Sequence, residues 1–169
     1  MSARLKALAV LAVLLAPLPT AAQSWKEYDY PDAGFTIQFP ATPTVGSGTY
    51  KTVTGVTVPA RTYSAQMDQS TYTVTVADYA KSAADQANAV RDAVKAVAAE
   101  GEIKVDVEAR INWEYGHELS VLDKDGGRSI VAIFFIDHRL FELVGRTAPP
   151  NPESGSGASI RFQQSLQFR

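Results

Sequence analysis

The sequence predicts an α+β protein in which a single antiparallel sheet lies between two helices, in the order strands, helix, strands, helix. Three observations carry this prediction. Residues 25–79 are dense in Thr, Val, Tyr and Phe, which is typical of strands. An alanine-rich helical pattern begins near residue 82, and residues 103–146 again have the composition and alternation of strands. With 169 residues, 46% of them hydrophobic and none of them cysteine, the chain must bury a core without disulfides.

The first 22 residues have the three parts of a secretory signal. Arg4 and Lys6 supply the positive start, Ala7–Ala16 is an apolar run, and Thr20-Ala21-Ala22 offers small residues for cleavage. A membrane span needs about 20 apolar residues, so this run is too short to remain as an anchor. We expect export, with residues 1–22 removed, no membrane anchor after cleavage, and residues 23–169 forming a single domain.

The charge balance argues against nucleic acid as a partner. Loss of the leader removes two of the 16 basic residues and leaves 14 against 18 acidic ones, which changes the formal charge from −2 to −4. Binding to a phosphate backbone requires clustered Lys and Arg, and the basic residues here are scattered singly between acids. No polybasic run for a membrane surface is present either.

Five short strands are predicted before the helix. The clearest is Phe35–Phe39, where apolar and polar residues alternate between Gly34 and Pro40. The other four predicted strands are residues 25–30, 50–53, 56–67 and 72–76, which are rich in strand-forming residues.

A helix is predicted from Ser82 to Glu100. Ser82 followed by Asp85 is a variant of the capping box, and Gly101 provides the stop. Apolar residues recur at helical spacing, at Ala83, Ala87, Val90, Val94 and Val97.

Four more strands are predicted at residues 103–113, 117–123, 128–136 and 140–146. Two-residue turns at Asp125-Gly126 and His138-Arg139 would fix their register. This register predicts one shared apolar face, made of Leu119, Val121, Ile130, Ala132, Phe134, Ile136, Phe141 and Leu143.

The opposite face of strand 128–136 is also apolar, through Val131, Ile133 and Phe135, so both sides of the sheet require a cover. A second helix over residues 158–168 is the candidate for the other side, because Ala158, Phe162 and Leu166 follow helical spacing.

The segments YPDAGFTIQFPATP (residues 30–43) and RFQQSL (residues 161–166) resemble the ends of small exported bacterial proteins of uncharacterised function. The order of elements is similar to the PsbP-like fold, an α/β/α sandwich, over nearly all of the mature chain. This resemblance implies an accessory or partner-binding module without a shared catalytic centre, and it transfers no site residue.

The residues also predict no enzyme, no cofactor and no metal site. Cysteine is absent, His117 and His138 are the only imidazoles, and the serines near glycine lack the setting of a nucleophile elbow. In the predicted register the two histidines lie roughly 13 Å apart, too far for a shared zinc ion. The segment from Asp123 has no glutamate at the twelfth position of a calcium loop.

The first functional hypothesis is therefore an exported, non-enzymatic protein that binds a protein or envelope partner through its sheet or a strand edge. The alternative is a small-ligand binder with a pocket between sheet and helix, for which the aromatic and ligand-capable group Trp113, Tyr115, His117 and Glu118 provides the candidate residues. A third possibility is a hydrolase that uses two carboxylates, drawn from acids such as Glu114, Glu118 and Glu142.

Overall fold

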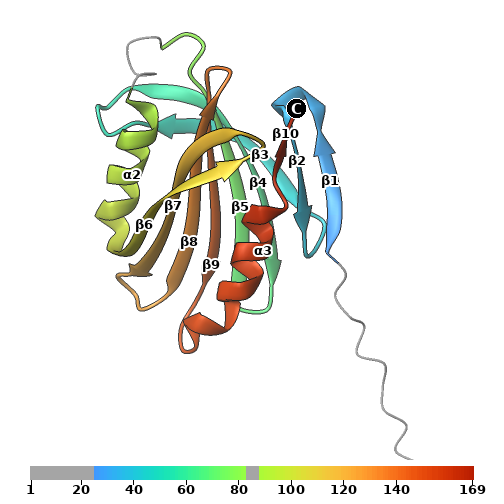
Figure 1. The fold of residues 1–169 in the computed structure, drawn as a ribbon, viewed down its shortest axis with the longest axis vertical. Helices are drawn as coiled ribbons and strands as arrows, with labels where there is room; N and C mark the ends of the chain where they lie inside the picture. Colours follow the sequence, from blue (N-terminus) through green and yellow to red (C-terminus); the bar gives the residue numbers. More distant parts are fainter. Residues whose placement is uncertain (1–24, 83–87) are drawn as a thin grey trace, which may run out of the picture.

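The computed structural model describes residues 25–82 and 88–169 (Figure 1). Within these ranges the chain forms two antiparallel sheets and two α-helices. The smaller sheet has three strands in the order β1-β2-β10, and the larger has seven in the order β3-β4-β5-β9-β8-β7-β6. The elements are β1 (Lys26–Tyr30), β2 (Phe35–Phe39), β3 (Thr44–Lys51), β4 (Thr57–Met67), β5 (Ser70–Asp78), α2 (Ala89–Glu100), β6 (Gly101–Ile111), β7 (Glu114–Asp123), β8 (Arg128–Ile136), β9 (Arg139–Thr147), α3 (Ser156–Gln164) and β10 (Gln167–Phe168), with short 3-10 turns at Pro31–Ala33 and Pro152–Gly155.

The expectation of one sheet is wrong, because the first two strands leave the main sheet. β2 is buried along almost its whole length and presents Phe35, Ile37 and Phe39 to the core. It pairs with β1 on one side and with the C-terminal β10 on the other. These aromatic side chains are buried by packing the small sheet face to face on the large one, where Phe35 meets Tyr63 and Phe141.

The large sheet has a core on each side, as the two-sided apolar pattern of β8 predicts. α2 packs on the side that carries Val131 and Ile133, together with Leu119 and Val121. α3 and the small sheet cover the other side, where Phe162 packs within the cluster that contains Phe134. Figure 1 shows α2 and α3 on opposite flanks of the sheet. The two helices thus pack on opposite sides of the large sheet, and on the α3 side the small sheet shares the cover.

The register predicted for the β7–β8 hairpin is wrong by one residue. Asp123 N donates to Gly127 O, and Leu122 pairs with Arg128, so the loop is one residue longer than a two-residue turn. Gly126 has φ 84°, the left-handed conformation that this longer loop needs. A shift of one residue turns every side chain of a strand to the other face. Leu119 and Val121 therefore pack under α2, away from Phe134.

The β8–β9 turn also shifts, but it preserves the predicted faces. The turn consists of Asp137 and His138, both with positive φ, and Ile136 pairs with Arg139. The shift is an even number of residues, so alternation is unchanged. Ala132, Phe134, Phe141 and Leu143 share one face, as predicted.

The bounds of the predicted helices shift. α2 is described from Ala89, while the predicted cap with Asp85 lies largely in residues 83–87, outside the described part of the chain. α3 begins at Ser156 and ends at Gln164, after which the chain forms β10 in place of the predicted continuation to residue 168.

Candidate functional site

The hairpin formed by β6 and β7 ends one edge of the large sheet, and most residues of β6 are exposed. β6 is the last strand of the sheet and pairs only with β7 among the described strands. Asn112 and Trp113 form its turn, with φ values of 49° and 73°. Two positive φ values at a two-residue turn match the type that joins twisted antiparallel strands. The turn therefore holds Trp113 at the tip of a regular hairpin.

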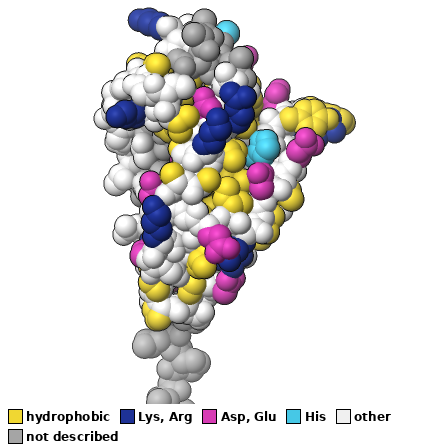
Figure 2. Space-filling model, turned by 90° about the vertical axis from the view of Figure 1, so that its left-hand side faces the viewer, with side chains coloured by type: hydrophobic (Ala, Val, Ile, Leu, Met, Phe, Trp, Pro, Cys, Tyr) yellow, Lys and Arg dark blue, Asp and Glu magenta, His cyan; other side chains and the backbone are white. Residues whose placement is uncertain are grey.

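Trp113 and Tyr115 project from this tip into solvent. Their exposed fractions are 78% and 66%, whereas the large aromatic residues of the two cores are buried. Arg110 lies between them, with its guanidinium carbon 4.1 Å from the ring centroid of Trp113 and 5.1 Å from that of Tyr115. Figure 2 shows apolar side chains at this projecting corner, flanked by acidic and basic groups. Stacking on the cation orders both rings while leaving their area exposed.

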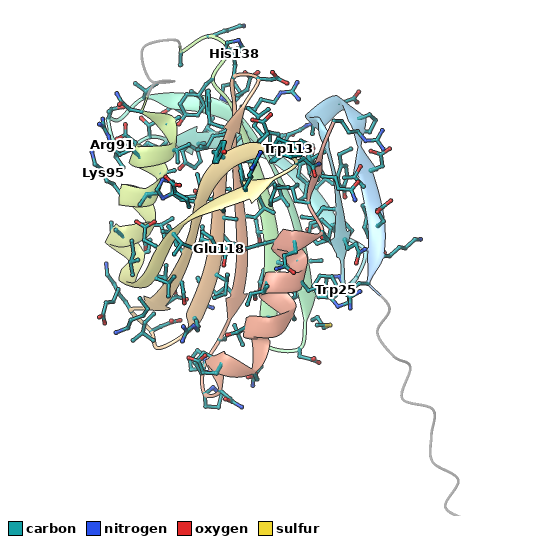
Figure 3. The ribbon with its side chains drawn as sticks, viewed as in Figure 1. Trp25, Arg91, Lys95, Trp113, Glu118 and His138 are labelled. Atoms are coloured by element: carbon teal, nitrogen blue, oxygen red, sulfur yellow. The ribbon has the colours of Figure 1, made fainter. Side chains whose placement is uncertain are left out.

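His117 lies on the same face of β7 as Tyr115, and its Nδ1 is 2.9 Å from Asp106 Oδ1 on β6. Glu118 points to the opposite face, because it lies across from Ala132, a residue of the core under α3. Figure 3 labels Trp113 near the hairpin tip and Glu118 farther along β7. The structure thus brings Trp113, Tyr115 and His117 to one end and one face, and it separates Glu118 from them.

The outer strand of this hairpin also exposes apolar side chains. Val105 and Val107 have exposed fractions of 45% and 49%. They lie on the face of β6 that is turned toward the α3 side, while Asp106 and Glu108 alternate with them on the other face. We call the β6–β7 hairpin, with its tip residues Arg110, Trp113 and Tyr115, the aromatic arm.

A second feature is a hollow beneath α2, which holds about 420 Å³. This volume lies within the range of small-molecule sites, roughly 300–1,000 Å³. Its floor is formed by Val121, Val131 and Val144 on three neighbouring strands, and Val97 of α2 forms one wall. None of the four predicted ligand-binding residues lines this hollow.

Glu142 contributes a carboxyl group to the hollow. It lies on β9 opposite Ile133, on the apolar face beneath α2. The hydroxyl of Tyr50 donates to its Oε2 at 3.3 Å, and in the described residues no cation forms an ion pair with it. Burial raises the pKa of the Glu142 carboxyl group, and the hydrogen bond from Tyr50 opposes this shift only in part.

The sequence reasoning considered Glu142 only as a possible hydrolase carboxylate and not as a ligand-binding residue. A signal for it existed, because Phe141 and Leu143 belong to one apolar face, which assigns Glu142 and Val144 to the other. That second face was already expected to be covered. A carboxylate between covered apolar positions is unusual and is therefore informative.

A charged cluster closes the end of the hollow near the β7–β8 turn. Arg146 Nε lies 2.9 Å from Asp123 Oδ2, and its Nη2 donates to Asp125. Ser129 also donates to Asp123, at 3.0 Å. Two carboxylates share one guanidinium, so Arg146 has no charge left uncompensated. The hydrogen bonds from Gly127 N and Arg146 lower the pKa of Asp125.

Two of the carboxylates considered for a hydrolase, Glu118 and Glu142, do not meet. Glu118 lies on the α3 side of the sheet and Glu142 on the α2 side, so the sheet itself separates them. Over residues 25–82 and 88–169, no three ligand-capable side chains gather into a potential metal site. The helices within these ranges are all too short or too polar to span a membrane.

The structure is similar to a solved structure of cyanobacterial PsbP (CyanoP) from Synechocystis sp. PCC 6803. The match has a TM-score of 0.55 at 11% identity and covers 92% of this chain and 99% of the other. A protein of unknown function from Pseudomonas aeruginosa, described as a putative regulator, has a TM-score of 0.47 at 11% identity, with 86% of this chain and 97% of the other covered. No family model matches the sequence, and neither does any curated protein. The chain has a PsbP-like fold, and at this identity the similarity extends to the fold alone.

Proposed function

We propose that this chain is an exported, non-enzymatic protein that binds a protein or cell-envelope partner through the aromatic arm. The observation that carries the proposal is the exposure of Trp113 and Tyr115 on an ordered hairpin tip. Trp, Tyr and Arg are the residue types that dominate binding energy at protein interfaces. Here all three stand together, already stacked before any partner arrives.

The edge of β6 adds a second means of contact. An edge strand presents backbone N–H and C=O groups that have no strand partner, and such a strand can accept an extended segment of another protein. β6 offers eleven residues for this contact, with Val105 and Val107 exposed along it. On its other face the acidic residues Asp106 and Glu108 limit indiscriminate strand pairing. This favours a selected partner over aggregation.

Preordering of the tip lowers the cost of association. Immobilising side chains at an interface normally reduces the binding free energy, by about 0.5–1.5 kcal/mol for each flexible side chain. The cation–π contacts of Arg110 hold both rings near their final positions, and the two-residue turn fixes the backbone beneath Trp113. The arm therefore has the residue types and the rigidity of an interface anchor.

The experiment that tests this proposal uses the mature chain, from Gln23 onward, as bait in an envelope extract of the source cell. A wild-type bait is compared with a Trp113→Ala, Tyr115→Ala double variant, and retained proteins are quantified by mass spectrometry. We expect at least one protein to be enriched on wild-type bait and lost on the double variant. A Val45→Ala bait is the matched control, because Val45 is an exposed apolar residue on the opposite edge strand β3. Equal recovery on all three baits would contradict a role for the arm.

The export part of the proposal rests on residues 1–22 of the sequence. Its test is the mass of the protein recovered from the periplasm or medium. A mature chain that begins at Gln23 supports cleavage at the predicted site, and a full-length chain that remains in the cytoplasm excludes it.

Small-ligand binding is the alternative function, and the stacked rings favour it over the hydrolase. Planar rings beside a guanidinium can hold a flat or sugar-like ligand at the arm tip. Saturable thermal stabilisation by such a ligand, lost in Trp113→Ala, would support this alternative. The absence of any protein partner in the bait experiment would strengthen it.

A further inference from the structure

The hollow beneath α2 has an apolar floor of valines and a carboxyl group, from Glu142, beside it. Val121 and Val131 are almost completely buried at its floor, while Val144 and Val97 are partly open to it. Glu142 stands on the same face of β9 as Val144, two residues away. An apolar floor with few polar groups is the usual composition of a small-molecule site, in which the polar groups set orientation.

The charges around the hollow select the sign of a ligand. Four carboxylates line it, from Glu100, Asp123, Asp125 and Glu142, against two cationic side chains, from Lys124 and Arg146. Both cations already have partners. Lys124 Nζ donates to the Ala99 carbonyl at 2.6 Å, and Arg146 is held by its two aspartates. Complementarity of charge therefore favours a cation over an anion.

No ion pair with Glu142 is found among the described residues. Glu142 is four residues from Arg146 along β9, roughly 13 Å at 3.3 Å per residue, and its one hydrogen bond in the described structure comes from the neutral hydroxyl of Tyr50. A carboxylate beside apolar side chains is costly when ionised, and a bound cation removes much of that cost. An ammonium group offers three donors, enough to engage the carboxylate without displacing Tyr50.

We propose that the hollow beneath α2 binds a small organic cation, a primary amine on an aliphatic body. Its ammonium group contacts the Glu142 carboxylate and its body covers Val131 and Val144. The chain then has a ligand site on the α2 side of the sheet that is separate from the aromatic arm.

The test uses three probes with one six-carbon chain and different head groups: n-hexylamine, n-hexanol and n-hexanoate. Binding to the mature protein is measured by calorimetry, and the site is located from the methyl resonances of the valines. We expect n-hexylamine to bind saturably and to shift the methyl signals of Val131 and Val144. Binding of n-hexanol should be weaker by about tenfold or more, given the usual strength of a charged hydrogen bond. Tighter binding of n-hexanoate than of n-hexylamine would overturn the assignment of a cation.

Two variants separate the carboxylate from the cavity. Glu142→Gln keeps the shape of the side chain and should weaken n-hexylamine about tenfold to a hundredfold, while n-hexanol changes little. Val97→Phe fills the mouth from the partly exposed surface of α2 and should weaken both probes. Glu118→Gln, on the opposite face of the sheet, is the matched control and should change neither. Unchanged n-hexylamine affinity in Glu142→Gln, or shifts confined to Val105 and Val107, would overturn the proposal.

Discussion

Replacement of Trp113 by alanine should remove partner binding while leaving the fold almost as stable as before. The side chain is 78% exposed, so its removal takes little apolar area from the folded state. The contact that it loses within the chain is the stack with Arg110, and an exposed cation–π contact contributes about 0.5–1 kcal/mol. We therefore expect the free energy of unfolding to fall by no more than about 1 kcal/mol.

The same substitution should have a larger effect on binding. A Trp at the centre of an interface typically contributes about 2 kcal/mol or more, which corresponds to roughly a thirtyfold weaker affinity. Urea titration gives the first quantity, and calorimetry with the recovered partner gives the second. Trp25→Ala provides the contrast, because Trp25 packs edge-on against the buried Tyr72 at 5.1 Å and should cost more stability. A loss above about 2 kcal/mol in unfolding for Trp113→Ala, the range of core truncations, would mean that Trp113 is a packing residue. An unaltered affinity would show that the arm does not carry binding.

Three further substitutions test the fold and the hollow. Phe162→Ala removes the fully buried ring that joins α3 to Phe39 at 5.2 Å, and it should lower the free energy of unfolding by about 3–5 kcal/mol in urea titration; a loss below 1 kcal/mol, the scale of a surface change, would place α3 outside the core. Gly116→Ala puts a Cβ atom 2.1 Å from the Ile133 carbonyl oxygen, so β7 and β8 must separate, at about 1–3 kcal/mol; full stability of this variant would contradict the strand contact. Glu142 has a raised pKa in the folded state, so the folded protein binds more protons than the unfolded one once the pH exceeds the ordinary value of 4.5, and its contribution to stability falls as the pH rises to the folded pKa. Glu142→Gln should remove this decline in urea titrations between that pH and neutrality, and an identical pH profile in both proteins would refute the assignment.

The alternation of apolar and polar residues was enough to predict many of the strands. Phe35–Phe39 and Arg128–Ile136 match β2 and β8 at both ends, because each has an unambiguous apolar pattern between strong turn residues. The separate small sheet could not be predicted in this way. Its strand β10 has only two residues, and its pairing with β2 joins positions 131 residues apart, as in Gln167 with Thr36. Alternation gives the face of a strand but not its partner.

The candidate site depended on a register that alternation alone could not supply. The extra residue in the loop before Gly127 reverses which face of β7 lies under α2. This reversal places Glu118 on the α3 side and His117 on the α2 side, beside Asp106. Trp113 was identified from its residue type, and its exposure at the tip follows from the turn. Glu142 was considered only as a possible hydrolase acid, because an acid in a strand was assumed to face water.

The hollow follows from a mismatch in size between α2 and the sheet. Seven strands at about 4.8 Å spacing span roughly 29 Å, whereas one helix is about 10 Å wide. On the other face, α3 and a three-stranded sheet share the cover. On its own face α2 contacts β6, β7 and β8, so the cover ends near β9, where Glu142 and Val144 stand. The hollow lies at that boundary.

At the far edge of the large sheet, β6 has no further strand beside it among the described residues, and its hairpin with β7 carries Trp113 at an exposed end. A longer or second helix on the α2 face would close the hollow, so the short α2 is what leaves a ligand-sized space over a half-buried carboxylate.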